Sequence, residues 1–370
     1  MNTSLSNFAS GRDNNFNLIR FIAATAVLFS HCYPLFYGSS GSDPLKSLVG
    51  ISLGTVAVDL FFISSGFLIA GSLFNRKNLT NFVKARVLRI YPALAICLLL
   101  TVLILGPIFT TLPLSHYFTN SQTYIYFFKN LILFFGEEAT LPGVFAGLPW
   151  PNTVNGSLWT LPFEVRAYAL LVIVGLLLHF CEMRWIRLPT KVIYLLIPII
   201  GMGLYLFNHF YKIFPVWYFG SEYARLFSMF FIGVAYYKYQ EKIPLSHTLF
   251  AVSAILLCIS SLHSDSFFVV YNLSLSYVLF YLAYVPTGII RKFNQYGDYS
   301  YGIYIYAFPV QQAVMYVNPD IVFLNFLCVS LFITFIFAYL SWQFIEERSL
   351  KLKSKTLRLF NKKQVFERGL

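Results

Sequence analysis

Six ionisable residues stand out because each interrupts a stretch of sequence that is otherwise apolar. They are Arg20, His31, Asp59, Arg86, Arg89 and Glu164. A charged group in hydrocarbon is costly, so an ionisable residue there is a hypothesis of function by default. A neutral imidazole at His31 can act as a general base, and a carboxylate at Asp59 or Glu164 can hold its tautomer. The three arginines suit the phosphates of a nucleotide-like donor.

The spacing of these residues predicts two layers. Arg20 and His31 are eleven residues apart, which on a helix leaves an angle of about 20° and a separation of about 16 Å along one face. Arg86 and Arg89 are three residues apart and share a helix face. Counted from the ends of their apolar segments, His31 and the two carboxylates lie near one side and the arginines near the other. Acyl transfer from a donor on the arginine side to a hydroxyl on the histidine side fits this arrangement.

Each residue also has a structural alternative. Arg20 could anchor its helix by snorkelling, and Arg86 and Arg89 could be ordinary positive residues at a membrane edge. His31 could be a satisfied structural histidine. Asp59 or Glu164 could close a buried ion pair with Arg166 or Arg225. Any of these roles, taken alone, is as common as the catalytic one.

The composition indicates the medium that holds these residues. The chain has 370 residues, of which 58% are hydrophobic and 11% are charged, whereas a soluble domain carries about 25% charged residues. Lipid therefore has to cover part of the surface. Because a helical span needs about 20 mostly apolar residues, we expect an all-α polytopic membrane helix bundle of about ten spans, over 15–36, 51–74, 87–111, 158–180, 190–210, 222–238, 244–263, 266–287, 298–317 and 320–345.

Lysine and arginine predict the orientation of the bundle. With the N-terminus inside, nearly all basic residues of the loops and of the C-terminal tail fall on the inner side, and only Lys46, Lys129 and Lys212 fall outside. The positive-inside rule therefore places both termini in the cytoplasm. The same distribution accounts for the net charge of +12 without a nucleic-acid partner. The basic tail is expected either to rest on anionic membrane lipids or to be solvated.

Three further expectations concern organisation. Residues 1–347 should form one membrane domain and 348–370 a basic cytoplasmic tail. The long outer loop, 112–157, is either a lid or acceptor surface or a plain connector, and its apolar segment 124–136 is predicted to be interfacial or re-entrant. The five cysteines have no short spacing and are interpreted as small hydrophobic residues, not as disulfides or a metal site.

Several motifs, in order along the chain, resemble those of acyltransferase family 3, the bacterial integral-membrane O-acyltransferases. The resemblance covers residues 14–347. The motifs are Arg20-x10-His31, the stretch from Val58 to Phe67, Arg86-x-x-Arg89 followed by Pro92, Ser157 to Glu164, Ser300 to Tyr304, and a closing glutamate at Glu346 or Glu347. Singly several are weak, but six in the right order and the right spans are specific.

The resemblance implies a reaction and its location. An acyl group, acetyl by this resemblance, would pass from cytoplasmic acyl-CoA to a hydroxyl of an envelope glycan or lipid-linked glycan, such as lipopolysaccharide O-antigen or exopolysaccharide, at the bacterial inner membrane. His31 would be catalytic, with Arg20, Arg86 and Arg89 serving the donor and no metal involved. Asp59 and Glu164 match motif positions, and their catalytic roles are inferred here.

Two departures from the family limit what is carried over. Many relatives have a histidine near position 307, where this chain has Ala307, so the role of that histidine is not transferred. Many relatives also carry an extracellular domain, so a separate periplasmic partner enzyme is expected for any second half-reaction. The alternatives are a transporter or flippase without chemistry and an acyltransferase for a small-molecule sugar.

Overall fold

The computed structural model describes residues 4–9, 11, 13–76, 79–183, 189–212 and 221–352. Within these residues the chain is helical and has no strand beyond three isolated bridges. The long helices are α2 (Phe16–Tyr37), α4 (Leu53–Arg76), α5 (Leu79–Leu100), α9 (Leu161–Met183), α10 (Thr190–Tyr211), α11 (Ser221–Lys238), α12 (His247–Ser260), α13 (Ser264–Tyr284), α14 (Ser300–Val317) and α15 (Phe323–Ser341).

Shorter helices connect or extend the long ones. They are α1 (Leu5–Phe8), α3 (Pro44–Val49), η1 (Thr101–Leu105), α6 (Gly106–Phe109), α7 (Leu114–Thr119), α8 (Ser121–Ile132), η2 (Gly156–Thr160), η3 (Gly288–Gln295) and η4 (Trp342–Glu346). Both η1 and η4 are π-helices that continue a long apolar helix. Such single π turns occur often at functional positions.

Every predicted span coincides with a helix, and within the described part of the chain seven helical stretches are long and apolar enough to cross a membrane. The three others are α11, α12 and α14. Helix α11 carries Glu222, Arg225 and Lys238, α12 has only 14 residues, and α14 contains four tyrosines and two glutamines. The protein is a polytopic helical membrane bundle, and a crossing by these three helices stays a prediction, as does the cytoplasmic position of the termini.

The described chain packs as two compact units, and each is discontinuous in sequence. Unit 1 contains residues 1–34, 39–72 and 160–298, and unit 2 contains 35–38, 73–159 and 299–370. The expected boundary between residues 347 and 348 is untested, and most of that tail, 353–370, lies outside the described residues.

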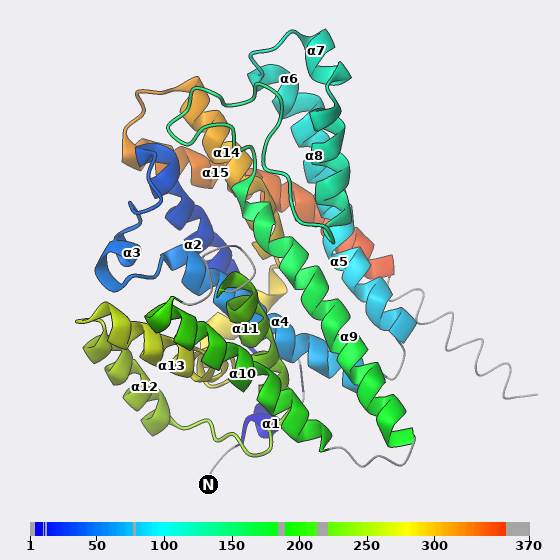
Figure 1. Ribbon diagram of the computed structural model, residues 1–370, viewed down its shortest axis with the longest axis vertical. Coiled ribbons are helices and arrows are strands. Elements are labelled where there is room, and N and C mark those ends of the chain that lie inside the picture. The colour runs from blue at the N-terminus through cyan, green and yellow to red at the C-terminus, as the bar shows by residue number, and fades with distance from the viewer. Residues whose placement is uncertain are drawn as a thin grey trace, which may run out of the picture. The chain divides into compact units, whose positions relative to one another are not determined.

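In unit 1, α4 and α11 approach so closely that only glycine fits at their contact. A Cβ atom on Gly66 would lie 1.9 Å from the Phe230 carbonyl oxygen, and one on Gly233 would lie 2.1 Å from that of Ile63. Small residues allow membrane helices to pack backbone to backbone in this way. Helices α12 and α13 are neighbours in Figure 1, joined by a tight turn before Ser264.

In unit 2, α14 packs along α15, and the predicted outer loop is tied to unit 2 by polar contacts. The Gln312 side chain donates to the carbonyl oxygens of Trp150 at 2.8 Å and Thr153 at 2.7 Å, and Asn155 donates to that of Ile305 at 2.9 Å. These bonds order a loop that is long for a plain connector. Segment 124–136 overlaps α8, a helix of 12 residues whose C-cap is Leu133 (φ 61°) and which is too short to span a membrane.

Candidate active site

Arg20 and His31 lie on one continuous helix, α2, as their spacing predicts. The His31 side chain is half-buried. Helix α2 runs without interruption past both residues, so their separation of about 16 Å is set by the helix rise.

A carboxylate lies beside His31, and it is not one of those that the sequence analysis selected. It belongs to Asp43, which is 3% exposed and whose charge acts on the imidazole. Asp43 accepts hydrogen bonds from the backbone nitrogens of Leu45 at 2.9 Å and Lys46 at 3.1 Å, which makes it the N-cap of α3. Its other oxygen accepts from the hydroxyl of Ser30, the residue before His31.

The same oxygen of Asp43 is 3.3 Å from the backbone nitrogen of Leu53, at the start of α4. The carboxylate is therefore fixed by three elements of unit 1: α2, α3 and α4. A carboxylate held this rigidly next to an imidazole can stabilise the imidazolium that forms when the base takes a proton. The sequence offers one clue to it, because Asp-Pro at 43–44 is a typical helix start.

Asp59 is fully buried and forms an ion pair with Arg225. One carboxylate oxygen is 2.6 Å from Arg225 Nη1, and the other accepts from the Tyr271 hydroxyl at 2.8 Å. Arg225 also contacts Glu222 at 2.6 Å. The alternative interpretation of Asp59, a buried pair with Arg225, is thus confirmed, and both of its oxygens are engaged by these partners. A catalytic role for Asp59 stays a prediction, because the bonds of its two oxygens are made to Arg225 and Tyr271.

Glu164 lies in the first turn of α9 and is held by neutral partners. The Tyr168 hydroxyl donates to it from the next turn, and the Ser65 hydroxyl is 3.5 Å away. Arg166 contacts the Tyr223 hydroxyl instead. Glu164 stays a candidate for contact with a substrate. It belongs to unit 1, as do His31, Asp43 and Asp59.

The predicted donor residues are distributed over both units. In unit 1, Arg20 Nε is 3.6 Å from Asp298, and its guanidinium lies 5.5 Å from the centre of the Phe61 ring. Arg86 and Arg89 belong to unit 2, on one face of α5. Both arginine side chains are half-buried.

Arg89 is paired with the glutamate that closes the family pattern. Its Nη1 is 3.4 Å from Glu346, which is 2% exposed and also accepts from the Ser341 hydroxyl at 3.0 Å. The structure thereby distinguishes between the two glutamates of the pattern, because Glu347 pairs with Lys351 instead. The π-helix η4 carries Glu346, and the Tyr301 ring of Ser-Tyr-Gly-Ile-Tyr lies 5.9 Å from the Arg89 guanidinium.

Comparisons with known proteins identify the family of this chain. Residues 13–343 match the acyltransferase domain of acyltransferase family 3. The chain belongs to this family, and it is a multi-pass membrane enzyme that transfers acyl groups.

Two relatives are similar to this chain. One is the O-acetyl transferase of Shigella phage Sf6, which is 28% identical over 94% of this chain and 99% of its own length. The other is Nodulation protein 10 of Rhizobium leguminosarum bv. viciae, which is 30% identical over 43% of each chain. No solved structure shows significant similarity to the chain.

Proposed function

We propose that this enzyme is an O-acetyltransferase of an envelope glycan. The acyl group would be acetyl, the donor cytoplasmic acetyl-CoA, and the acceptor a hydroxyl of a surface or lipid-linked glycan on the outer side of the inner membrane. The observation that supports this proposal best is that α2 carries both Arg20 and His31, with the buried carboxylate of Asp43 bonded to Ser30, the residue next to His31. The name of the full-length phage relative supports the acetyl group.

The proposed reaction uses the imidazole twice. His31 takes the proton of the acceptor hydroxyl while that oxygen attacks the thioester carbonyl. The C–S bond then breaks, and the imidazolium returns the proton to the departing thiolate, which yields the ester and free CoA. The negative charge of Asp43 stabilises the imidazolium between these two transfers.

The arginines would bind the donor in this proposal. Guanidinium groups bind phosphates through paired, charge-assisted hydrogen bonds. Arg20, Arg86 and Arg89 are the candidates for the phosphates of CoA, and a carboxylate contact orients two of them, Arg20 through Asp298 and Arg89 through Glu346. The ordered outer loop would form part of the acceptor surface.

The decisive experiment replaces His31 by alanine in a strain that depends on this gene for glycan acylation. We expect the acetyl ester to disappear from the envelope glycan, measured as its mass increment by mass spectrometry, while the protein stays inserted at the wild-type level. His263→Ala is the matched control, since His263 lies in the turn before α13 and outside the site. Full acylation in the His31→Ala strain would refute the assignment of the base.

A second measurement tests the donor and acceptor directly. Purified enzyme with radiolabelled acetyl-CoA should transfer label to the extracted glycan precursor. Transfer to a free small sugar alone would instead support the small-molecule alternative.

A further inference from the structure

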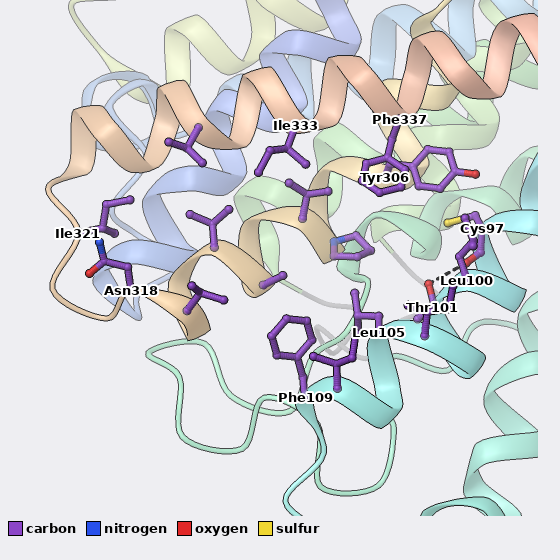
Figure 2. A pocket seen from close by; sticks show the side chains of 18 residues that line it. Cys97, Leu100, Thr101, Leu105, Phe109, Tyr306, Asn318, Ile321, Ile333 and Phe337 are labelled. Carbon is purple, nitrogen blue, oxygen red and sulfur yellow. Dashed lines mark hydrogen bonds between the residues drawn. The ribbon is translucent and has the colours of Figure 1, made fainter.

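Unit 2 contains a cavity of about 540 Å³ that none of the predicted catalytic or donor residues lines. Its walls come from the α5–α6 stretch, α14 and α15, as Figure 2 shows. Its volume is in the range of pockets that bind a ligand, about 300–1,000 Å³. The cavity is thus large enough to be a second site of the enzyme.

The lining of this cavity excludes a polar ligand. Most of it is aliphatic or aromatic, and the few polar groups are already bonded. The Thr101 hydroxyl donates to the Cys97 carbonyl oxygen at 2.8 Å. The Cys97 thiol lies 3.5 Å from the carbonyl oxygen of Ile305. Asn318 is the exception, since its exposed side chain marks one end of the cavity. Apolar cavities stay dry and bind apolar molecules.

The cavity opens on an apolar surface of unit 2, which the predicted crossing of the membrane by α14 and α15 would place against lipid. Three of its lining residues are strongly exposed: Ile104 at 52%, Ile108 at 63% and Val317 at 74%. In a membrane-spanning unit, such apolar side chains are in contact with lipid. A lipid chain can therefore enter from the side without crossing water.

The long direction of the cavity runs along α14. Lining residues extend from Tyr306 to Val317, a distance of about 16 Å at the helix rise of 1.5 Å per residue. The Val317 end precedes the connection to α15, which the charge distribution places on the outer side. A chain bound here would lie in the outer half of the membrane with its polar end at the outer surface.

The outer end of the cavity is joined to the outer loop. The ring of Phe109, a lining residue, is 5.2 Å from that of Phe145 in the loop and 5.1 Å from that of Tyr316. The Tyr117 hydroxyl, from α7 in the loop, donates at 3.0 Å to the Val102 carbonyl oxygen of the π-helix η1. A lipid in the cavity would thus present its headgroup next to the loop.

We infer that this cavity binds the hydrocarbon tail of the lipid that carries the glycan acceptor. The inference rests on the proposed function and names its substrate class as a lipid-linked glycan rather than a finished polymer. A bulk lipid needs only a smooth apolar surface, whereas this site is a recess with one polar end that meets an ordered loop. Binding of the tail raises the local concentration of the acceptor and limits it to the membrane plane.

Photolabelling and kinetics together test this inference. The probe is a long-chain polyisoprenyl phosphate with a diazirine in its tail, added to the purified full-length protein in nanodiscs. We expect crosslinks to residues of α14 and α15 in the cavity, and competition by the unlabelled polyisoprenyl phosphate. An equal yield from a diazirine-bearing phosphatidylglycerol, or no competition, would overturn the inference.

The variant Val329→Trp should fill the cavity from α15. Its matched control is Ile336→Trp, since Val329 is 40% exposed and lines the cavity, whereas Ile336 is 44% exposed on the same helix and does not. Ala313→Phe fills it from α14 and serves if the tryptophan variant does not fold. We expect the cavity variants to lower probe labelling about tenfold, because a few methylene groups of the lipid tail would no longer be buried in the cavity. The control should be labelled to the same extent as the wild type.

The kinetic comparison uses acetyl transfer to the extracted lipid-linked precursor and to the same glycan released from its lipid. The cavity variants should raise KM for the lipid-linked acceptor and leave turnover of the released glycan unchanged. Equal KM values for variant and wild type would overturn the inference while the proposed function stands. If the wild type transfers nothing to either acceptor, the proposed function fails, and the photolabelling still decides whether the cavity binds a tail.

Discussion

At the scale of single residues, Asp43 is the part of the candidate site with the clearest geometry. Its carboxylate is bonded from α2, α3 and the start of α4, and its charge reaches His31. It touches no reacting atom in the proposed reaction, so it is a positioning residue for the base.

Asp43→Asn should reduce kcat because the variant removes the negative charge but keeps an oxygen that can accept hydrogen bonds. We expect a loss of about 10- to 100-fold, which is smaller than the loss of about 10²- to 10⁴-fold expected when the general base itself is removed, with KM for acetyl-CoA unchanged. Steady-state kinetics measure this loss of kcat. Asp320→Asn is the control, because Asp320 lies in the α14–α15 connection. Unchanged kcat and an unchanged pH profile would remove Asp43 from the mechanism.

The Asp59–Arg225 pair makes a different prediction, since both groups are buried. Arg225→Met leaves a buried carboxylate without its cation and should lower stability by about 3–5 kcal/mol. The double variant Asp59→Asn/Arg225→Met should recover a large part of that loss. Thermal unfolding in detergent compares the two, and a double variant as unstable as the single one would contradict a charge-pair origin.

Activity of the same double variant separates the two interpretations of Asp59. If the folded double variant keeps wild-type kcat, Asp59 is structural. The sequence could predict that Asp59 had a basic partner, because a buried charge needs one, but it could not choose between Arg166 and Arg225. It missed Asp43 because that residue follows an apolar segment instead of interrupting one, and only folding brings it to His31.

At the scale of elements, the contact between α4 and α11 is the most constrained. Gly66→Ala would place a methyl group against the Phe230 backbone, which cannot move as a side chain can. We expect a loss of about 1–3 kcal/mol, typical of overpacking, and a lower thermal unfolding midpoint. Gly203→Ala on α10 is the control, because nothing lies within 4 Å of its Cβ position; equal midpoints for the two variants would contradict this packing.

The outer loop should loosen in acid because of Glu138. Burial raises its pKa, but the Thr140 hydroxyl at 3.0 Å and Lys129 at 3.5 Å outweigh burial, so the net pKa is below its usual value. A depressed pKa means that its stabilising contribution is present above the unfolded pKa and is lost as pH falls through the folded one. Limited proteolysis of the loop should therefore accelerate in that acidic range, and less so in Glu138→Gln, which starts from the weakened state.

Helix locations could be predicted from hydropathy, but several boundaries could not. The third span was expected from residue 87, whereas α5 begins at Leu79, because its first turns carry polar residues on an exposed face and so lack an apolar run. Helices α1, α3 and α7 are short and depend on local capping and packing, as Asp43 shows for α3. The π-helices leave no mark in the periodicity of an apolar segment.

At the scale of the whole molecule, the charge distribution predicts an orientation that cysteine labelling can test. In a cysteine-free background, Glu137→Cys and Asp320→Cys should react with an impermeant maleimide in intact cells. Glu241→Cys and Lys292→Cys should react only after permeabilisation. The alternation follows from the positive-inside rule.

The same labelling decides whether α14 crosses the membrane, since Lys292 and Asp320 flank it. Helix α14 was expected as a span, but it is more polar than the seven stretches that are apolar enough to cross a membrane, because it contains Gln311 and Gln312, which are buried in the protein. Labelling of both positions from one side would show that the bundle has fewer crossings than ten.

The π turn at Thr101–Leu105 has a consequence for how this chain can change in length. A π turn contains one residue more than the α turn it replaces, so deleting one residue there would restore a regular α-helix and leave the residues after it on their present faces. Gly106, where any Cβ would meet the Tyr117 hydroxyl, would still face that ring. A single-codon deletion at this point should therefore be tolerated better than one inside the regular part of α5, which would turn every later residue of the helix by about 100°.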